Sequence, residues 1–118
     1  MTELIACLST GKGTWGHVMK VAEGQDWEKV YLIGDAFAKG KLQLRANMEF
    51  IEVDFNKFLP ELIEDIKSKL EGKIKGLEAG LNLISGSGKE HMAIMSALLK
   101  LGIGIRLIAF TKNGVREI

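Results

Sequence analysis

The sequence is poor in cysteine, proline and tyrosine. Its 118 residues include one cysteine, one proline and one tyrosine. A single cysteine, Cys7, cannot form an internal disulfide, which agrees with a reducing compartment. Cys7 lies within the apolar run 4–8, so we expect a buried structural thiol. Apolar runs reach only strand length, below the roughly 20 residues of a membrane span, and we expect a cytoplasmic protein without a membrane partner.

The sequence also has no large excess of positive or negative charge. The 16 lysines and arginines nearly balance 15 acidic residues, for a formal net charge of +1. Binding of a long nucleic-acid duplex normally needs a basic face or stripe, so we do not expect that partner. No cysteine or carboxylate group has the spacing of a zinc site, and we expect neither a metal nor a cofactor. Length and composition fit one domain spanning residues 1–118.

Short apolar runs alternate with helical patterns along the chain. The predicted strands are residues 3–9, 29–33, 48–53, 77–83 and 103–110, and the predicted helices are residues 14–23, 57–71 and a segment that begins near residue 88. Residues 35–46 have a poor helical period and stay open. The alternation predicts an α/β fold, a Rossmann-like doubly wound and mostly parallel sheet with strand order 3-2-1-4-5. Asn113-Gly114 predicts a C-terminal hairpin with an antiparallel edge strand.

The last predicted helix is strongly apolar. Met92, Met95, Leu98 and Leu99 share one face, and alanines and Ile94 occupy the flanks. We therefore expect it to be more buried than the helix at 57–71. Methionine fills irregular gaps in cores, so we interpret Met92, Met95 and, in the first predicted helix, Met19 as core residues.

A first glycine-rich loop follows the first predicted strand. Residues 11–16 read G-x-G-x-x-G between a strand and a helix. Glycines there allow close backbone approach, and a helix N-terminus offers unpaired N–H groups to a phosphate. Asp35, at the end of the second strand, is where a dinucleotide fold places a ribose-binding acid. Turns that only permit packing, and a solvated carboxylate at Asp35, are the alternatives.

A second glycine-rich loop, Ser85-Gly86-Ser87-Gly88-Lys89, precedes the last predicted helix. It resembles a Walker phosphate loop superficially, but Leu83 replaces the first glycine of that motif. Glu90 replaces the magnesium-binding hydroxyl with a carboxylate that would repel phosphate. ATP hydrolysis by that route is therefore not expected.

Both loops should open onto one crevice, because the first and fourth strands of this fold are neighbours at its ligand-binding switch point. His17 and His91 fall near the starts of the adjoining helices, where packing or capping is their simpler role. The expected ligand-binding residues are Gly11, Lys12, Gly13, Thr14, Ser85, Gly86, Ser87, Gly88 and Lys89, with Ser9 and Thr10 beside them.

Residues 82–102 resemble the signature of CARF domains, the CRISPR-associated Rossmann-fold sensors of cyclic oligoadenylates. In that family a serine or threonine, three small residues and a basic residue follow the fourth strand, as in residues 85–89. The resemblance implies a stand-alone antiviral-defence sensor: a homodimer that binds a ring-shaped second messenger across the first and fourth strand loops. A separate effector protein is a partner it allows.

The same resemblance allows the chain to be a ring nuclease. Cleavage would need the ribose 2′-hydroxyl aligned with the adjacent phosphorus, and a lysine can stabilise the developing charge without a metal. Lys89 would be that catalytic lysine, and Ser9 or Thr10 would position the phosphate. An NAD-type dinucleotide-binding protein, and an interaction module without a small ligand, remain alternatives.

Overall fold

A computed structural model describes residues 3–9 and 12–118 of the chain. Strands and helices alternate as the apolar pattern predicts. The strands are β1 (Glu3–Leu8), β2 (Lys29–Gly34), β3 (Met48–Glu52), β4 (Glu78–Asn82), β5 (Gly104–Thr111) and β6 (Gly114–Glu117). The helices are η1 (Lys12–Thr14), α1 (Trp15–Glu23), α2 (Ala36–Lys41), α3 (Leu59–Leu70) and α4 (Gly88–Lys100). The open segment 35–46 thus contains a short helix, because the Asp35 side chain caps it by accepting the Ala38 N–H.

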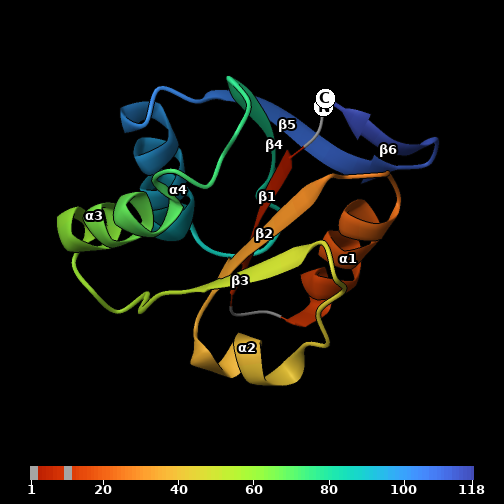
Figure 1. The fold of residues 1–118 in the computed structure, drawn as a ribbon. Coiled ribbons are helices and arrows are strands. Elements are labelled where there is room, and N and C mark those ends of the chain that lie inside the picture. The colour runs from red at the N-terminus through yellow and green to blue at the C-terminus, as the bar shows by residue number, and fades with distance from the viewer. Residues whose placement is uncertain (1–2, 10–11) are drawn as a thin grey trace.

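The strands form one sheet in the order β3-β2-β1-β4-β5-β6 (Figure 1). The pairs among β3, β2, β1, β4 and β5 are parallel, and β6 pairs antiparallel with β5. The predicted Rossmann-like order and the C-terminal hairpin strand are confirmed. Because all these parallel strands point the same way, their carboxyl ends meet at one edge of the sheet.

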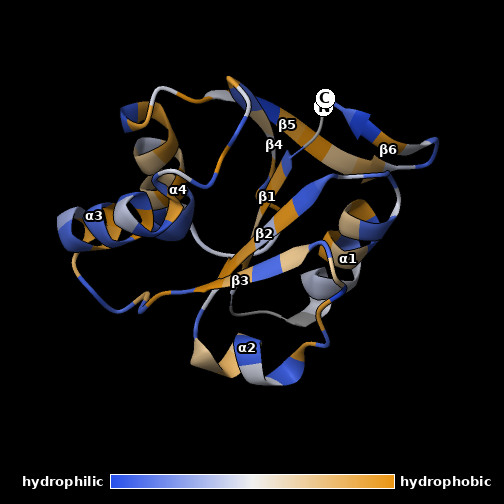
Figure 2. Cartoon of the chain, in the orientation of Figure 1, coloured by the Kyte–Doolittle hydropathy of each residue, from blue (hydrophilic) through white to orange (hydrophobic). Residues whose placement is uncertain are grey.

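Helices cover both faces of the sheet (Figure 1). Alternate residues of β1 divide between two cores, since successive strand side chains point to opposite faces. Leu4, Ala6 and Leu8 pack with α1, and Ile5 and Cys7 pack with α3 and α4. Every residue of β1 is buried, and the strand is largely orange in Figure 2. The prediction of a buried Cys7 is confirmed.

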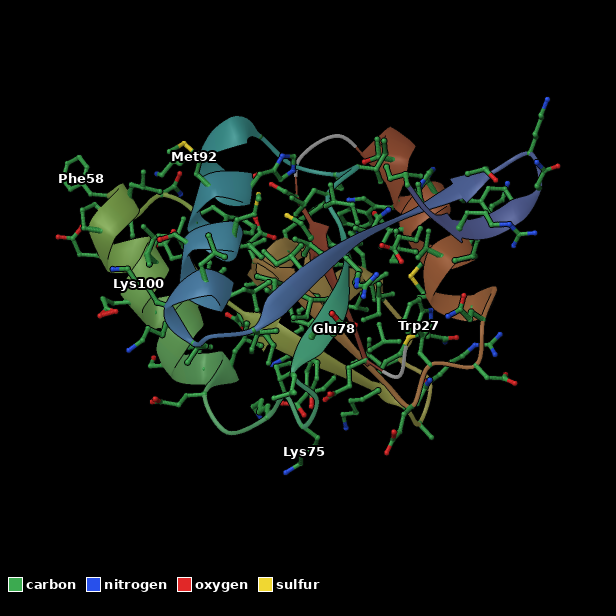
Figure 3. All side chains as sticks on the ribbon, turned by 90° about the horizontal axis from the view of Figure 1, so that it is seen from above. Trp27, Phe58, Lys75, Glu78, Met92 and Lys100 are labelled. Atoms are coloured by element: carbon green, nitrogen blue, oxygen red, sulfur yellow. The ribbon has the colours of Figure 1, made fainter. Side chains whose placement is uncertain are left out.

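Helix α4 departs from the sequence prediction. Its buried side is formed by Glu90, Ala93, Ile94, Ala97 and Leu98. Met92 and Met95 are exposed instead, so their interpretation as core residues is wrong. Figure 3 shows Met92 at the outer surface of the helix. The pattern misled because α4 is apolar on two sides, and periodicity alone does not tell which side meets the sheet.

At the amino end of the sheet, the buried carboxylate of Glu3 holds the connection between α3 and β4. Its two oxygens accept the Lys75 N–H at 2.9 and 3.0 Å, and one of them accepts the Gly76 N–H at 2.8 Å. The carboxylate therefore replaces water as the partner of two backbone donors, which is the condition under which a charge tolerates burial.

Glu3→Gln is expected to lower the free energy of unfolding by about 1–3 kcal/mol, because an amide group would face backbone donors with one acceptor fewer. Urea denaturation measures the change. Glu28→Gln is the control, since Glu28 is exposed nearby, and surface substitutions usually change stability by less than about 0.5 kcal/mol. Equal unfolding midpoints for the two variants would contradict this account of Glu3.

Candidate functional site

The segments that lead from β1 and β4 toward the two glycine-rich loops meet at the carboxyl ends of these strands. These strands are parallel neighbours, with Leu4 paired to Gly80 and Ala6 to Asn82. The Ser9 N–H, one residue beyond β1, donates to the Ser85 hydroxyl at 3.0 Å, and this bond is buried. The fold therefore brings together two segments that lie 76 residues apart in the chain.

Ser9 lies at the base of this junction. Its carbonyl oxygen accepts the Trp15 ring N–H at 2.8 Å, so both backbone polar groups of Ser9 are engaged. Its side chain is different: Ser9 is 4% exposed, and in the part of the chain that the structure describes its Oγ has no hydrogen-bond partner. Leaving a buried hydroxyl unpaired costs about 1–3 kcal/mol, so such a group calls for a physical explanation.

The second loop is held rigidly by its own side chains. Ser87 is the N-cap of α4, and its Oγ accepts the Glu90 N–H while Glu90 Oε1 accepts the Ser87 N–H at 2.8 Å. The Ser85 carbonyl accepts a hydrogen bond from His91 Nε2 at 2.7 Å. Gly86 has a φ of 107°, a conformation that side-chain-bearing residues rarely adopt.

Glu90 has a role that its interpretation as a repelling carboxylate missed. It is buried and closes a reciprocal capping box with Ser87. The signal was present in the sequence, because S-x-x-E at residues 87–90 is the capping-box pattern. Its carboxylate also lies at the positive end of the α4 dipole, so the chain itself satisfies part of the anion-binding capacity of that helix end.

Lys89 contacts a third loop. Its ammonium group donates to the Phe55 carbonyl at 2.9 Å, in the segment between β3 and α3. The side chain is exposed. Catalysis by Lys89 at a phosphate beside Ser9 would therefore require the amine to leave this carbonyl.

The first loop continues into η1 and α1. Thr10 and Gly11 lie outside the described residues, whereas Gly13 and Thr14 belong to η1, which leads directly into α1. Neither η1 nor the first turn of α1 contains an acidic residue. The positive end of the α1 dipole is thus not neutralised by a carboxylate of its own first turn, in contrast to α4.

Both histidines form hydrogen bonds within the protein. His17 Nε2 accepts the Phe110 N–H at 3.2 Å and lies 3.4 Å from Asn82 Nδ2. The same Asn82 amide donates to the Ile108 carbonyl at 2.8 Å. His17 therefore connects α1 to β5. Asn82 is buried and connects β4 to β5 through its side-chain amide, a role that the sequence pattern did not predict.

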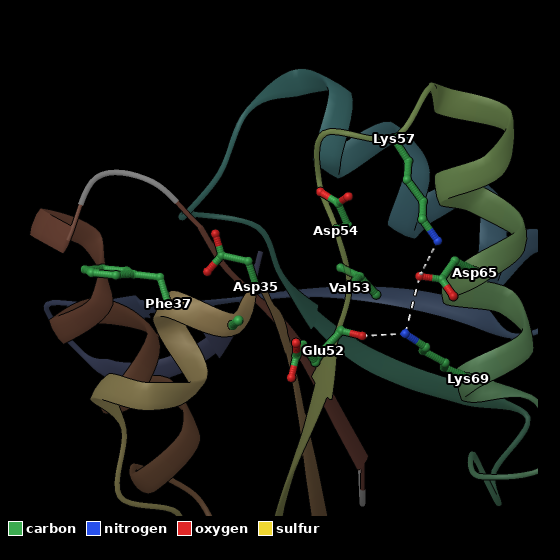
Figure 4. A pocket seen from close by; sticks show the side chains of 9 residues that line it. Asp35, Phe37, Glu52, Val53, Asp54, Lys57, Asp65 and Lys69 are labelled. Atoms are coloured by element: carbon green, nitrogen blue, oxygen red, sulfur yellow. Dashed lines mark hydrogen bonds and ion pairs between the residues drawn. The ribbon is translucent and has the colours of Figure 1, made fainter.

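A hollow of about 560 Å³ lies at the carboxyl ends of β2 and β3 (Figure 4). Asp35, Glu52 and Asp54 border it from the strand ends. On the α3 side Asp65 pairs with Lys57 at 3.6 Å and with Lys69 at 3.4 Å. Asp35 thus borders an open space, although one of its oxygens is occupied by capping α2.

Neither a metal-binding cluster nor a membrane-spanning helix is found among residues 3–9 and 12–118. No group of three or more histidines, cysteines or carboxylates lies close enough together to hold a metal ion. No helix among these residues is both long and apolar enough to cross a bilayer.

No protein-family model matches the chain, and no curated protein matches its sequence.

Gly86→Ala is expected to destabilise the protein by about 2 kcal/mol or more, because a Cβ at a positive φ is strained and this one is also crowded. It would lie 2.9 Å from Glu90 Oε1, 3.0 Å from Cys7 Sγ and 3.1 Å from His91 Nε2. Gly88→Ala is the matched control in the same loop, since its Cβ would meet nothing within 4 Å. Thermal unfolding of the two variants provides the comparison, and equal losses would show that the Gly86 conformation is not required.

Cys7 should make stability depend on pH in the alkaline range. Burial raises the pKa of its thiol from 9.0 to about 12, and the negative charge of Glu90 adds to the rise. A raised pKa in the folded state gives stability that is complete below pH 9 and is lost as the pH rises toward 12.

Urea unfolding at pH 8 and pH 10 tests this dependence. Relative to Cys7→Ala, the wild type should lose about 1.4 kcal/mol more over this interval, because only its unfolded state releases the thiol proton. The lysines titrate in both proteins and cancel in the comparison. Parallel pH profiles would show that Cys7 does not titrate differently on unfolding.

Proposed function

We propose that the protein binds a phosphate-bearing nucleotide at the paired β1 and β4 loops, and that this ligand is of the cyclic oligoadenylate type. The observation that carries the proposal is Ser9, whose buried hydroxyl has no partner in the described chain. It lies at the switch point of a doubly wound sheet, where such folds bind ligands. A phosphate oxygen there would accept a hydrogen bond from this hydroxyl.

The charge distribution favours a phosphate on the α1 side of the crevice. Glu90 already occupies the positive end of α4, whereas the first turns of η1 and α1 carry no acidic residue. Backbone donors at a helix start attract an anion most where no internal carboxylate competes. Ser85 supports this placement, because its hydroxyl fixes the Ser9 backbone.

A cyclic oligoadenylate is favoured over other nucleotides by the resemblance of residues 82–102 to CARF domains. Such a ring would be shared by two copies of the chain, each contributing one pair of loops. The contact of Lys89 with the Phe55 carbonyl favours binding as the primary activity, with ring cleavage as a secondary one. In this setting the chain would serve as a cytoplasmic defence sensor that signals to a separate effector.

An NAD-type dinucleotide is the second candidate. It is favoured by Asp35, which follows β2 and borders the hollow of about 560 Å³ at the same edge of the sheet. Its remaining oxygen would accept a ribose hydroxyl.

Titration calorimetry with cyclic tetra-adenylate, cyclic hexa-adenylate and NAD distinguishes the candidates. Ser9→Ala is expected to weaken binding of a cyclic oligoadenylate at least tenfold, because a hydrogen bond to a charged phosphate is lost. In the absence of ligand, the same substitution should leave the melting temperature unchanged or raise it, because it removes an unpaired buried hydroxyl.

Ser68→Ala is the control, since Ser68 is exposed on α3; its affinity should equal that of the wild type. Binding of NAD alone would support the second candidate. No heat with any of the three ligands would contradict the nucleotide proposal, and linear product after incubation with the ring would add the cleavage activity.

A further inference from the structure

Two aromatic side chains lie together at the same edge of the sheet as the proposed site. Trp15 begins α1 and Phe37 lies in the first turn of α2, and their ring centroids are 6.4 Å apart with an interplanar angle of 56°. Both helices follow the carboxyl ends of neighbouring parallel strands, since α1 comes after β1 and α2 after β2. The aromatic pair therefore belongs to the edge at which this fold binds ligands.

Phe37 does not contribute to the core. It is 55% exposed, whereas Ala38 beside it is fully buried. Figure 4 shows its ring on the side of the hollow away from α3. Water against a large apolar ring is unfavourable, and aromatic rings that are exposed at nucleic-acid-binding surfaces typically serve as platforms on which bases stack. Phe37 thus has the exposure and the chemistry of a base-stacking residue.

Trp15 connects this ring to the proposed phosphate position. Its indole N–H donates to the Ser9 carbonyl at 2.8 Å, and its ring is tilted against Phe37. One indole ring therefore separates Ser9 from Phe37. In a nucleotide one sugar of comparable width separates the phosphate from the base. A phosphate at the Ser9 hydroxyl would leave its base within reach of Phe37.

A lysine ammonium already lies over the Phe37 ring. Lys41 Nζ is 5.4 Å from the ring centroid, and Lys41 is exposed. A cation–π contact at an exposed site changes an equilibrium by about two- to fivefold, whereas a stacked base contributes about 5- to 150-fold in affinity. A base can therefore replace the lysine on the ring.

We propose that a nucleobase of the ligand stacks on the exposed Phe37 ring beside Trp15. The inference rests on the proposed function, because it assigns the base of the same nucleotide. Every base has a π-face, so stacking selects a base-containing ligand over a sugar phosphate or inorganic phosphate without choosing among the bases.

Titration calorimetry with cyclic tetra-adenylate tests the Phe37 side chain. Phe37→Leu is expected to weaken binding about fivefold or more, because it keeps an apolar side chain but removes the aromatic face. Phe37→Tyr should retain the wild-type affinity, since it keeps the ring. Phe58→Leu is the matched control and should bind as the wild type does, because Phe58 is 82% exposed at the outer end of α3 (Figure 3).

Nuclear Overhauser effects detect the contact without a substitution. With cyclic tetra-adenylate bound, the Phe37 ring protons are expected to give cross-peaks to adenine H2 or H8, and the Phe58 ring protons are not. The melting temperature of ligand-free Phe37→Leu should equal that of the wild type, because an exposed ring adds little to stability. Adenosine, which carries no phosphate, is the second probe and should give the same cross-peaks at higher concentration.

The outcomes separate this inference from the proposed function. Equal affinities of the wild type and Phe37→Leu for cyclic tetra-adenylate, or a bound ring without cross-peaks to Phe37, would overturn the stacking and leave the proposed function intact. Cross-peaks from adenosine in a protein that binds no cyclic oligoadenylate would contradict the proposed function alone. If neither adenosine nor a cyclic oligoadenylate binds, both proposals are wrong.

Discussion

The hydrogen bond from the Ser9 amide to the Ser85 hydroxyl joins the two halves of the fold at the point where its connections diverge. After β1 the chain leads to α1 on one face of the sheet. After β4 it leads to α4 on the opposite face. A bond at this position fixes the separation of the two loops. Every feature of the proposed site, including the enclosed Ser9 hydroxyl, depends on that separation.

Three buried polar side chains differ in whether they have hydrogen-bond partners. The carboxylates of Glu3 and Glu90 are buried, and each accepts backbone N–H groups that would otherwise lack partners. The Ser9 hydroxyl is also buried but has no such partner among the described residues. Burial with a partner is a structural solution, whereas burial without one is a cost that a bound anion would remove. This difference separates the scaffold residues from the candidate ligand residues.

Helix α4 combines three tasks along 13 residues. Ser87 and Glu90 cap its first turn, and its inner side packs small and branched residues such as Ala93 and Ile94 into the core. Its outer side carries exposed apolar residues, among them Met92 and Leu99. The second glycine-rich loop is therefore continuous with a rigid helix that also fills the core.

The sequence by itself determined the element order, the parallel sheet and the C-terminal hairpin, because apolar period, glycine turns and Asn113-Gly114 act locally. It also indicated that both glycine-rich loops lie at one edge of the sheet, because both follow parallel strands; the sheet order then confirmed that these strands are neighbours. Only the tertiary structure decided which side of α4 is buried, that Glu90 is buried as a cap of α4, and that the Ser9 hydroxyl is enclosed. These outcomes depend on contacts such as the one between residues 9 and 85, and local patterns carry no information about partners so distant in the chain.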